Sequence, residues 1–274
     1  MEQYIVLPVR KGGLGNQMFQ VAAAIVYAEE TNRTILLPKE FYNLHNRSHQ
    51  DYGETVFREI QQRISVAIDG TMIEKLLRQG FLQHPGEPGF EDWTPINGSG
   101  NILLHGYFQN YPPIGRHEGL IRNLYLQGLS DFRSLYPPCS TRIGLHVRRG
   151  DYLQSPYSDV LPVQPLSYYE QAFHSFPFSI ESFEVFIFSD DMDWCKQQAL
   201  FQNLPKKVFV EEVNDVKALA MMTSCMGGFI CGNSTFSWWG AFLGCFSEKR
   251  PVVVPKKWFK DPVGNLFPPE WICI

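Results

Sequence analysis

The second half of the chain alternates short apolar runs with longer helical stretches, and this alternation restricts the possible folds more than any other feature. Strands are expected at residues 142–147, 183–188, 207–210, 228–231 and 251–254, and helices at residues 167–175, 192–201, 216–225 and 234–245. Strands joined by helical crossovers run parallel, because each crossover returns the chain to the same edge of the sheet. The pattern therefore predicts a doubly wound α/β domain.

The first half begins with the same arrangement and then loses it. Strands are expected at residues 4–9, 34–37 and 101–107, and helices at residues 16–31, 71–78 and 116–127. Glycine, proline and polar residues dominate much of residues 42–100. We therefore expect two α/β domains, an N-terminal one at residues 1–137 and a C-terminal one at residues 138–274. Two such domains would hold a ligand in the cleft between them, at the carboxyl ends of the strands.

The composition is that of a globular protein and excludes some partners. Hydrophobic residues make up 44% of the chain, and the net charge of −4 gives no general positive field for nucleic acid or anionic lipid. No apolar run approaches the ~18 residues of a membrane span, and the N-terminus does not read as a signal peptide. The six cysteines form no CxxC pair, so we expect buried free thiols in a soluble, cytoplasmic protein.

A glycine-rich turn, Gly-Gly-Leu-Gly-Asn-Gln at residues 12–17, opens the first expected helix. Glycines let backbone amides approach an anionic ligand, and a helix N-terminus favours negative charge. Gly13 and Gly15 have the spacing of a dinucleotide fingerprint, but Met18 stands at the third glycine position and no P-loop lysine follows. The alternative is a plain tight turn with Asn16 as the helix N-cap.

The segment His-Val-Arg-Arg-Gly-Asp-Tyr, residues 146–152, follows an expected strand. Because strand side chains alternate between faces, His146 and Arg148 should point the same way. A guanidinium matches phosphate oxygens bidentately and stays charged at any working pH. Arg148 and Arg149 are therefore candidate phosphate ligands, and a solvated, ion-paired loop is the alternative.

Acidic residues follow the next expected strand. Ser189 and Asp190 lead into Asp191 and Asp193, which spell a DxD, and carboxylates of this kind suit Mg²⁺ or Mn²⁺. An aspartate that opens a helix is also an ordinary N-cap, and acidic residues suit the first turn. We favour capping over metal binding. His45 and His49 have the i,i+4 spacing of zinc ligands without the surrounding pattern, so no metal site is expected there.

A fourth segment, residues 232–240, runs from an expected strand into a helix. Turns rich in Asn, Ser and Thr present amides and hydroxyls to phosphate, which makes Ser234 and Thr235 candidate ligand contacts. Phe236, Trp239 and Leu243 fall on one helical stripe, a pattern more typical of core packing.

Together, the segments GGLGNQMFQ, HVRRGDY, FSDD and GNSTFSWWGAFL, at residues 12–20, 146–152, 188–191 and 232–243, resemble the family 11 glycosyltransferases, the α-1,2-fucosyltransferases. They occur in the family's order across nearly the whole chain, so the combination is highly specific. The resemblance implies two facing Rossmann-like domains of the GT-B type. It also implies inverting, metal-independent transfer from GDP-β-L-fucose to the 2-hydroxyl of a galactoside. The membrane anchor and stem of animal members are not seen, so the likeness is to a microbial or viral type.

The resemblance also assigns roles to residues. An HxR pair at the nucleotide maps onto His146 and Arg148, with Arg148 at the β-phosphate, and Asp215 is the positional match for an acidic residue that reads guanine. Arg149 would assist Arg148 at the leaving group, and Asp151 is the candidate base for the acceptor hydroxyl. The donor-binding residues expected are Gly13, Gly15, Asn16, Gln17, His146, Arg148, Ser189, Asp190, Asp215, Asn233, Ser234, Thr235 and Phe236.

Three alternatives stay open at this point. Another fucosyl linkage, or a related GDP-deoxysugar, would keep all four segments. A metal-dependent sugar transferase would depend on Asp191 and Asp193. A nucleotide- or glycan-binding module without activity would bind GDP and transfer nothing, which the presence of His146, Arg148 and Asp151 disfavours.

Overall fold

The chain divides into two compact units. The computed structural model describes residues 3–7, 12–38, 52–61, 67–68, 75, 78–80, 82–83, 93–96, 98–245, 250–260 and 264–274. Unit 1 comprises Met1–Leu129 with Gly264–Pro268, and unit 2 comprises Ser130–Val263 with Pro269–Ile274. The change of unit at Leu129 comes a little before the boundary expected at residues 137 and 138.

Unit 2 is built on a six-stranded parallel sheet. Its strands are β6 (Arg142–Val147), β7 (Glu184–Ser189), β8 (Lys207–Val210), β9 (Gly228–Ile230), β10 (Val252–Val254) and β11 (Ile272–Cys273). They lie in the order β11-β10-β9-β6-β7-β8, and every pairing is parallel. The chain starts at β6, moves outward through β7 to β8, and then returns to β9 on the other side of β6. This is the strand order of a Rossmann fold, so the expected doubly wound domain is confirmed.

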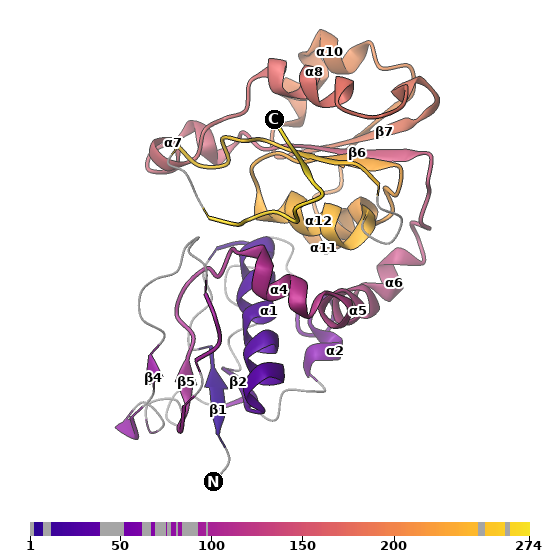
Figure 1. Cartoon of the computed structure of the whole chain (residues 1–274). Coiled ribbons are helices and arrows are strands. Elements are labelled where there is room, and N and C mark those ends of the chain that lie inside the picture. Colours follow the sequence, from indigo (N-terminus) through magenta and orange to yellow (C-terminus); the bar gives the residue numbers. More distant parts are fainter. Residues whose placement is uncertain are drawn as a thin grey trace. The chain divides into compact units, whose positions relative to one another are not determined.

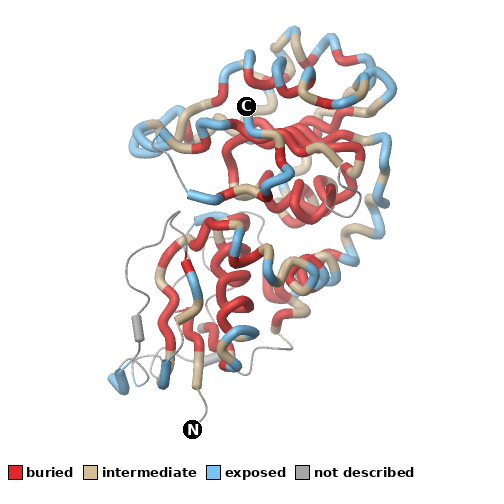
Figure 2. The backbone as a smooth tube through the Cα atoms, in the orientation of Figure 1, coloured by how far each residue is buried: buried red, intermediate tan, exposed pale blue. Residues whose placement is uncertain are grey.

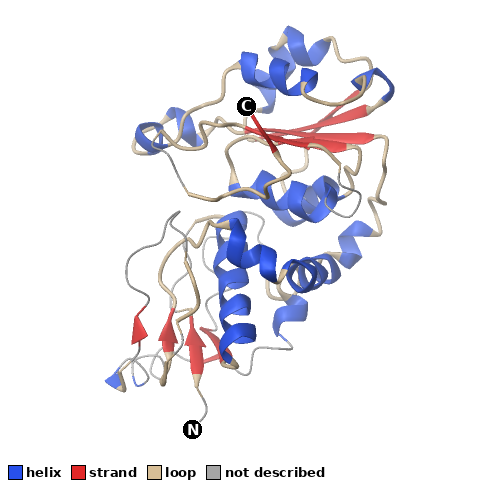
Figure 3. Cartoon of the chain, in the orientation of Figure 1, coloured by secondary structure: helices blue, strands red, loops and turns tan. Residues whose placement is uncertain are grey.

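Helices cover both faces of this sheet, as Figures 1 and 3 show for α8 and α10 on one side and α11 and α12 on the other. The helical segments are α6 (Ser130–Arg133), η2 (Asp151–Leu153), α7 (Tyr157–Val160), α8 (Leu166–His174), η3 (Ile180–Ser182), α9 (Met192–Gln197), α10 (Ala199–Gln202), α11 (Asp215–Thr223) and α12 (Thr235–Cys245). The central strands are buried along their length (Figure 2).

The apolar alternation of β6 decides which side chains meet the core and which reach the site. Ile143, Leu145 and Val147 join the cluster formed by Tyr169 and neighbouring residues of the covering helices. The side chain of His146 points to the other face of the sheet, where its ring meets that of Phe236 on α12 at 6.1 Å between centroids.

Unit 1 is a second parallel α/β unit. Its elements are β1 (Tyr4–Val6), α1 (Leu14–Thr31), β2 (Thr34–Pro38), α2 (Arg58–Gln61), β3 (Ala67–Ile68), β4 (Leu82–Gln83), β5 (Ile102–Leu103), α4 (Tyr111–Arg116) and α5 (Glu118–Gly128). The strands lie in the order β3-β2-β1-β5-β4, all parallel. Helix α1 buries Ala22, Ala23 and Ala24, whose small side chains allow close packing against β1 and β2.

Some expected elements differ from the structure. The strand expected at residues 101–107 is short: β5 ends at Leu103, and Gly106 and Phe108, which adopt positive φ angles, lie beyond its end. The helix expected at residues 192–201 breaks at Gln198, whose side-chain Nε2 donates to the Trp194 carbonyl at 2.8 Å. The helix expected at residues 116–127 is divided between α4 and α5. His45, His49 and most of the helix expected at residues 71–78 lie outside the described residues.

All six cysteines are free thiols, as expected, although burial holds for only four of them. Cys139 is half-buried and Cys273 is exposed. Of the helices within the described ranges, none is long and apolar enough to cross a membrane.

Candidate active site

Three of the four sequence segments meet at one edge of the unit 2 sheet. Strands β9, β6 and β7 are neighbours and run parallel, so the residues that follow them emerge side by side. Residues 148–152 follow β6, Asp190 follows β7, and residues 231–234 follow β9. The chain reverses its direction of winding between β6 and β9, and ligands of open α/β sheets bind at such a switch point.

Gly232 shows how closely the loops after β6 and β9 approach each other. A Cβ atom at this position would lie 2.9 Å from the His146 carbonyl oxygen and 3.3 Å from the Arg148 backbone nitrogen. Because these are backbone atoms, they cannot move aside as a side chain could. Glycine is therefore required here, and it brings the turn at residues 232–235 against the base of Arg148.

Arg148 is held by two carboxylates. Its Nη2 donates to Asp151 Oδ2 at 2.8 Å, and its Nε lies 3.2 Å from Asp190 Oδ2. The guanidinium also lies over the ring of Tyr152, 5.3 Å from its centroid. Burial alone would lower the pKa of Arg148, but Asp190, Tyr152 and Asp151 outweigh it and raise the pKa. The side chain is therefore a fixed positive charge at the switch point.

Arg149 is held by a different set of residues. Its Nε donates to Asp191 Oδ2 at 3.1 Å, and its guanidinium stacks over Trp194 at 3.9 Å from the ring centroid. Its backbone N–H donates to Asp190 Oδ1 at 2.9 Å. The two arginines are therefore directed to different partners, and Arg149 fastens the loop after β6 to helix α9.

The DxD segment shows the capping geometry that the sequence favours. Asp191 is the N-cap of α9, with its carboxylate accepting from the Trp194 N–H at 3.3 Å, and Asp193 lies in the first turn. Ser189 Oγ accepts from the Asp191 N–H at 2.9 Å. Within the described ranges, no group of three or more His, Cys, Asp or Glu side chains is arranged to hold a metal ion.

His146 is buried, with only 4% of its surface exposed. Burial, with a smaller contribution from Arg148 against that of Asp190, lowers the pKa of the imidazole to about 4. The ring is therefore neutral at physiological pH and can serve the site as a hydrogen-bonding group rather than a cation.

This pKa predicts how the stability of the chain depends on pH. The unfolded chain protonates His146 near pH 6.5 and the folded chain near pH 4, so the free energy of unfolding falls as the pH drops through this window. The expected contribution is about 2–3 kcal/mol. Urea titrations of the parent and His146→Gln at pH 7.5, 5.5 and 4 measure it. If the parent loses no more stability than His146→Gln between pH 7.5 and pH 4, the lowered pKa of His146 is contradicted.

The turn after β9 is fixed from several sides. Tyr152 Oη donates to the Asn233 carbonyl at 2.9 Å, and Asn233 Nδ2 donates to the carbonyls of Pro162 and Trp258 at 2.8 and 3.0 Å. The side chain of Asn233 thus fastens two neighbouring loops to the turn. Ser234 Oγ accepts from the Phe236 N–H at 3.3 Å.

Thr235 and Phe236 complete this turn and begin helix α12. Both are half-buried, whereas Asn233 and Ser234 are buried. The backbone amides at the start of α12 therefore lie at the partly exposed side of the turn, next to the switch point.

Asp215 lies further along the same edge, after β8. It is the first residue of α11 and is half-buried. The N-cap is Asn214, whose side chain accepts from the Lys217 N–H at 3.0 Å. Asp215 is therefore not the cap of α11, because its neighbour Asn214 fills that position.

Unit 1 has its own carboxyl edge, where the glycine-rich turn precedes α1. The N-cap is Gly13 rather than Asn16, and no side chain caps the helix. Gln17 Nε2 donates to the Gly12 carbonyl at 3.0 Å, and Asn16 Oδ1 accepts from Gln109 Nε2 at 3.1 Å. Gly15 is buried within the first turn.

Three residues that hold the loops at these sheet edges in place are not among the site residues predicted from the sequence. Tyr152 is the last residue of the segment at residues 146–152 and directly follows Asp151, so the sequence motif itself could have pointed to it. Trp194 is expected only as part of a helix, and Gln109 only as part of a loop. Gln109 carries one usable signal, because it is a polar residue in the loop that follows a strand neighbouring β1.

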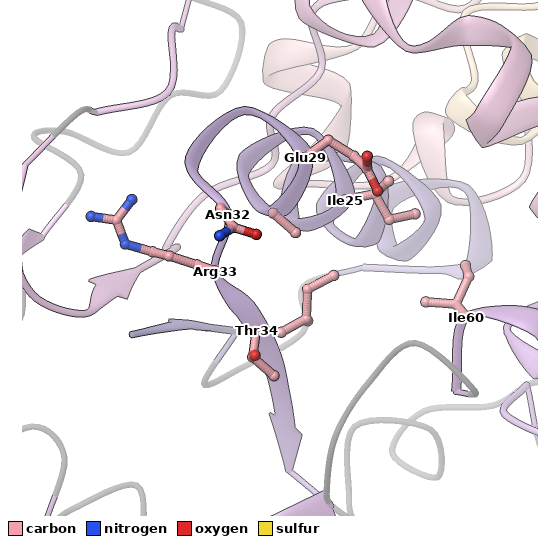
Figure 4. Close-up of a pocket in the computed structure, with 8 residues that line it drawn as sticks. Ile25, Glu29, Asn32, Arg33, Thr34 and Ile60 are labelled. Atoms are coloured by element: carbon pink, nitrogen blue, oxygen red, sulfur yellow. The ribbon is translucent and has the colours of Figure 1, made fainter. Parts of the chain in front are cut away.

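A cavity of about 380 Å³ lies elsewhere in unit 1 (Figure 4). It is lined by Ile25, Ala28, Glu29, Asn32, Arg33, Thr34, Ile35 and Ile60. These residues lie at the end of α1, at the start of β2 and in α2, so the cavity is at the amino end of β2. None of the expected site residues lines it.

Comparisons with known proteins agree with this architecture. A model of glycosyl transferase family 11 matches residues 8–274. The chain is 28% identical to the O-antigen biosynthesis glycosyltransferase WbnK of Escherichia coli, over 95% of this chain and 97% of that protein. It is 27% identical to an alpha-1,2-colitosyltransferase of Escherichia coli, over 98% and 99%, and 25% identical to the galactoside 2-alpha-L-fucosyltransferase SEC1 of Bos taurus, over 96% and 72%.

A solved structure shares the fold. The fucosyltransferase NodZ from Bradyrhizobium superposes with a TM-score of 0.50 at 14% identity, over 88% of this chain and 93% of that chain. The fold is the α/β arrangement of GT-B-type fucosyltransferases, with parallel sheets in both units. Because the family model covers nearly the whole chain, the protein is a glycosyltransferase and belongs to glycosyl transferase family 11.

Proposed function

We propose that the enzyme transfers L-fucose from GDP-β-L-fucose to the 2-hydroxyl of a galactoside, with inversion and without a metal ion. The observation that carries this is Arg148, a charged guanidinium held at the switch point of the unit 2 sheet. Two relatives support the sugar and the linkage, since the proteins of Caenorhabditis elegans and Bos taurus are named galactoside 2-alpha-L-fucosyltransferases.

The proposed chemistry follows from where charge develops. Breaking the anomeric C–O bond leaves an oxocarbenium-like sugar and a GDP whose β-phosphate gains negative charge. Arg148 would exchange its contacts with Asp151 and Asp190 for phosphate oxygens, and the backbone amides at the start of α12 lie on the same edge. The acceptor hydroxyl attacks the anomeric carbon and gives its proton to a base, for which Asp151 is the candidate.

A related deoxysugar is the second candidate for the donor. One relative of nearly the same length is an alpha-1,2-colitosyltransferase, and colitose lacks the 3-hydroxyl that fucose carries. GDP and the linkage would be shared, so the two candidates differ only in the groups that contact the sugar.

A donor screen tests the proposed function. The enzyme is incubated with GDP-L-fucose, GDP-colitose, GDP-mannose or UDP-galactose and a panel of galactosides, and products are detected by mass spectrometry with and without EDTA. We expect a fucosylated product whose yield EDTA does not change. Transfer from GDP-colitose alone would give the second candidate, and activity lost in EDTA and restored by Mn²⁺ would contradict metal independence.

Asp215 is proposed to select guanine. Guanine presents N1–H and the N2 amino group side by side, two donors that suit one carboxylate, whereas adenine and uracil leave a carboxylate oxygen unpaired. We expect Asp215→Ser to weaken GDP binding roughly tenfold to hundredfold, measured by calorimetry, with UDP and ADP uniformly poor.

Asn214→Ala is the matched control for Asp215. It removes the cap of α11 and costs about 1 kcal/mol of stability, but it should leave GDP affinity near that of the parent. If the serine variant of Asp215 binds GDP as the parent does, the guanine-reading residue lies elsewhere.

A further inference from the structure

Gln109 is a buried polar residue of unit 1 whose side-chain amide is only half satisfied by hydrogen bonds. Only 5% of its surface is exposed. Its Nε2 donates to Asn16 Oδ1 at 3.1 Å, while its Oε1 is buried with no hydrogen-bond partner among the described residues. A buried amide oxygen without a partner destabilises a fold, and native chains keep few of them.

The backbone that carries Gln109 is also held in an unfavourable conformation. Phe108, the residue before it, has a φ of 54°, a value that bulky side chains rarely adopt. Its buried ring packs edge-on against Trp93, with 5.6 Å between centroids. The Asn110 N–H donates back to the Phe108 carbonyl at 2.9 Å. Packing therefore keeps a strained turn in place, and the turn sets the position of Gln109.

The absence of a side chain at Gly12 leaves the space that the Asn16 carboxamide occupies. Gly12 has a φ of 77°, and a Cβ atom there would lie only 2.1 Å from Asn16 Nδ2. Gly12 and Gly13 are exposed and Asn16 is half-buried, so this carboxamide lies at an accessible turn. With Oδ1 committed to Gln109, the side of Asn16 that can donate hydrogen bonds lies against the glycine turn.

The two residues come from neighbouring strands at one edge of the sheet. β1 and β5 pair in parallel, and the turn before α1 follows β1 while Gln109 follows β5. Because β1 and β5 are neighbouring parallel strands, the loops that follow them lie together at the carboxyl edge of the unit 1 sheet.

From this arrangement we infer that Gln109 is a positioning residue for the transfer reaction, acting through Asn16. It sets the orientation of the Asn16 carboxamide so that Nδ2 donates to an oxygen of the bound GDP-sugar. An amide that only filled space would be replaced without loss by an apolar side chain of similar shape, which would also remove the partnerless oxygen. The inference rests on the proposed donor site of this turn.

A double-mutant cycle tests the inference with Gln109→Met, Asn16→Ala and the pair combined. The cycle uses whichever GDP-sugar the parent turns over, so an error in the donor sugar does not decide it. We expect each single change to lower kcat/KM roughly tenfold or more, and the double variant to be no worse than Asn16→Ala alone. The Tm of Gln109→Met should stay close to that of the parent.

Two results would overturn the inference. Losses in kcat/KM that multiply in the double variant would mean that Gln109 and Asn16 act independently. A lowered Tm with unchanged kcat/KM in Gln109→Met would mean that Gln109 only braces the fold. If the parent is active and either of these results is found, the inference about Gln109 fails and the proposed function is unaffected. If the parent is inactive with GDP-fucose but active with another GDP-sugar, only the proposed donor is contradicted.

Discussion

Replacing Arg148 with lysine is expected to lower kcat by roughly 10²–10³, the usual cost of losing one contact that stabilises charge in a transition state. Lysine keeps the positive charge but lacks the planar fork that binds two phosphate oxygens at once. It also lacks the separate Nη2 and Nε donors with which Arg148 meets Asp151 and Asp190 at 2.8 and 3.2 Å. Steady-state kinetics with saturating GDP-fucose and galactoside measure the effect.

Arg149→Lys is the matched control, because it makes the same change one residue along the chain. Arg149 stacks on Trp194 and pairs with Asp191. Its replacement should therefore lower the free energy of unfolding clearly and kcat only slightly. Near-normal kcat in the Arg148 variant would show that Arg148 does not stabilise the leaving group. A larger loss of kcat at Arg149 would show that the other arginine acts there.

Replacing Asp151 with asparagine should lower kcat by about 10²–10⁴, the range for loss of a general base. Asparagine keeps the shape of the side chain and cannot accept a proton. GDP affinity should stay the same or increase, because the change removes a carboxylate that competes with the diphosphate for Arg148. Turnover and GDP affinity are measured separately, by initial rates and by calorimetry.

The ion pair between Asp151 and Arg148 offers a competing role for the carboxylate. If Asp151 only held Arg148 in place, the asparagine variant would lose GDP affinity in step with kcat. Asp190→Asn is the comparison variant, since Asp190 holds both Arg148 and the backbone of Arg149 without being a candidate base. We expect it to weaken GDP binding, in contrast to Asp151→Asn, because it also removes the acceptor of the Arg149 N–H and so loosens the loop that carries Arg148.

Most of the second half of the fold could be predicted from the sequence because β6 to β10 lie in short, mainly apolar runs, whereas the two-residue β11 gives no such signal. The strands at residues 142–147 and 207–210 match β6 and β8 to the residue. In such a sheet, the loops after neighbouring strands must meet at one edge, so the order of the strands is enough to group Arg148, Asp190 and Ser234.

The remaining features depend on contacts that no local pattern encodes. The first strand of unit 1 is followed by a turn whose helix begins at Leu14, two residues before the expected start, because Gly13 rather than Asn16 takes the cap position. Arg148 and Arg149 have different partners because the Arg149 guanidinium stacks on Trp194, which lies on a separate helix. The role of Gln109 depends on a bond to Asn16, far away in the sequence.

The product of the reaction tests the central claim most directly. The enzyme is incubated with GDP-β-L-fucose and the galactoside that it accepts best, and the purified product is analysed by NMR for linkage and anomeric configuration. The account predicts a single α-linked fucose on the 2-hydroxyl of galactose, which requires inversion at the anomeric carbon. A β-linked product, or fucose on another hydroxyl, would contradict it.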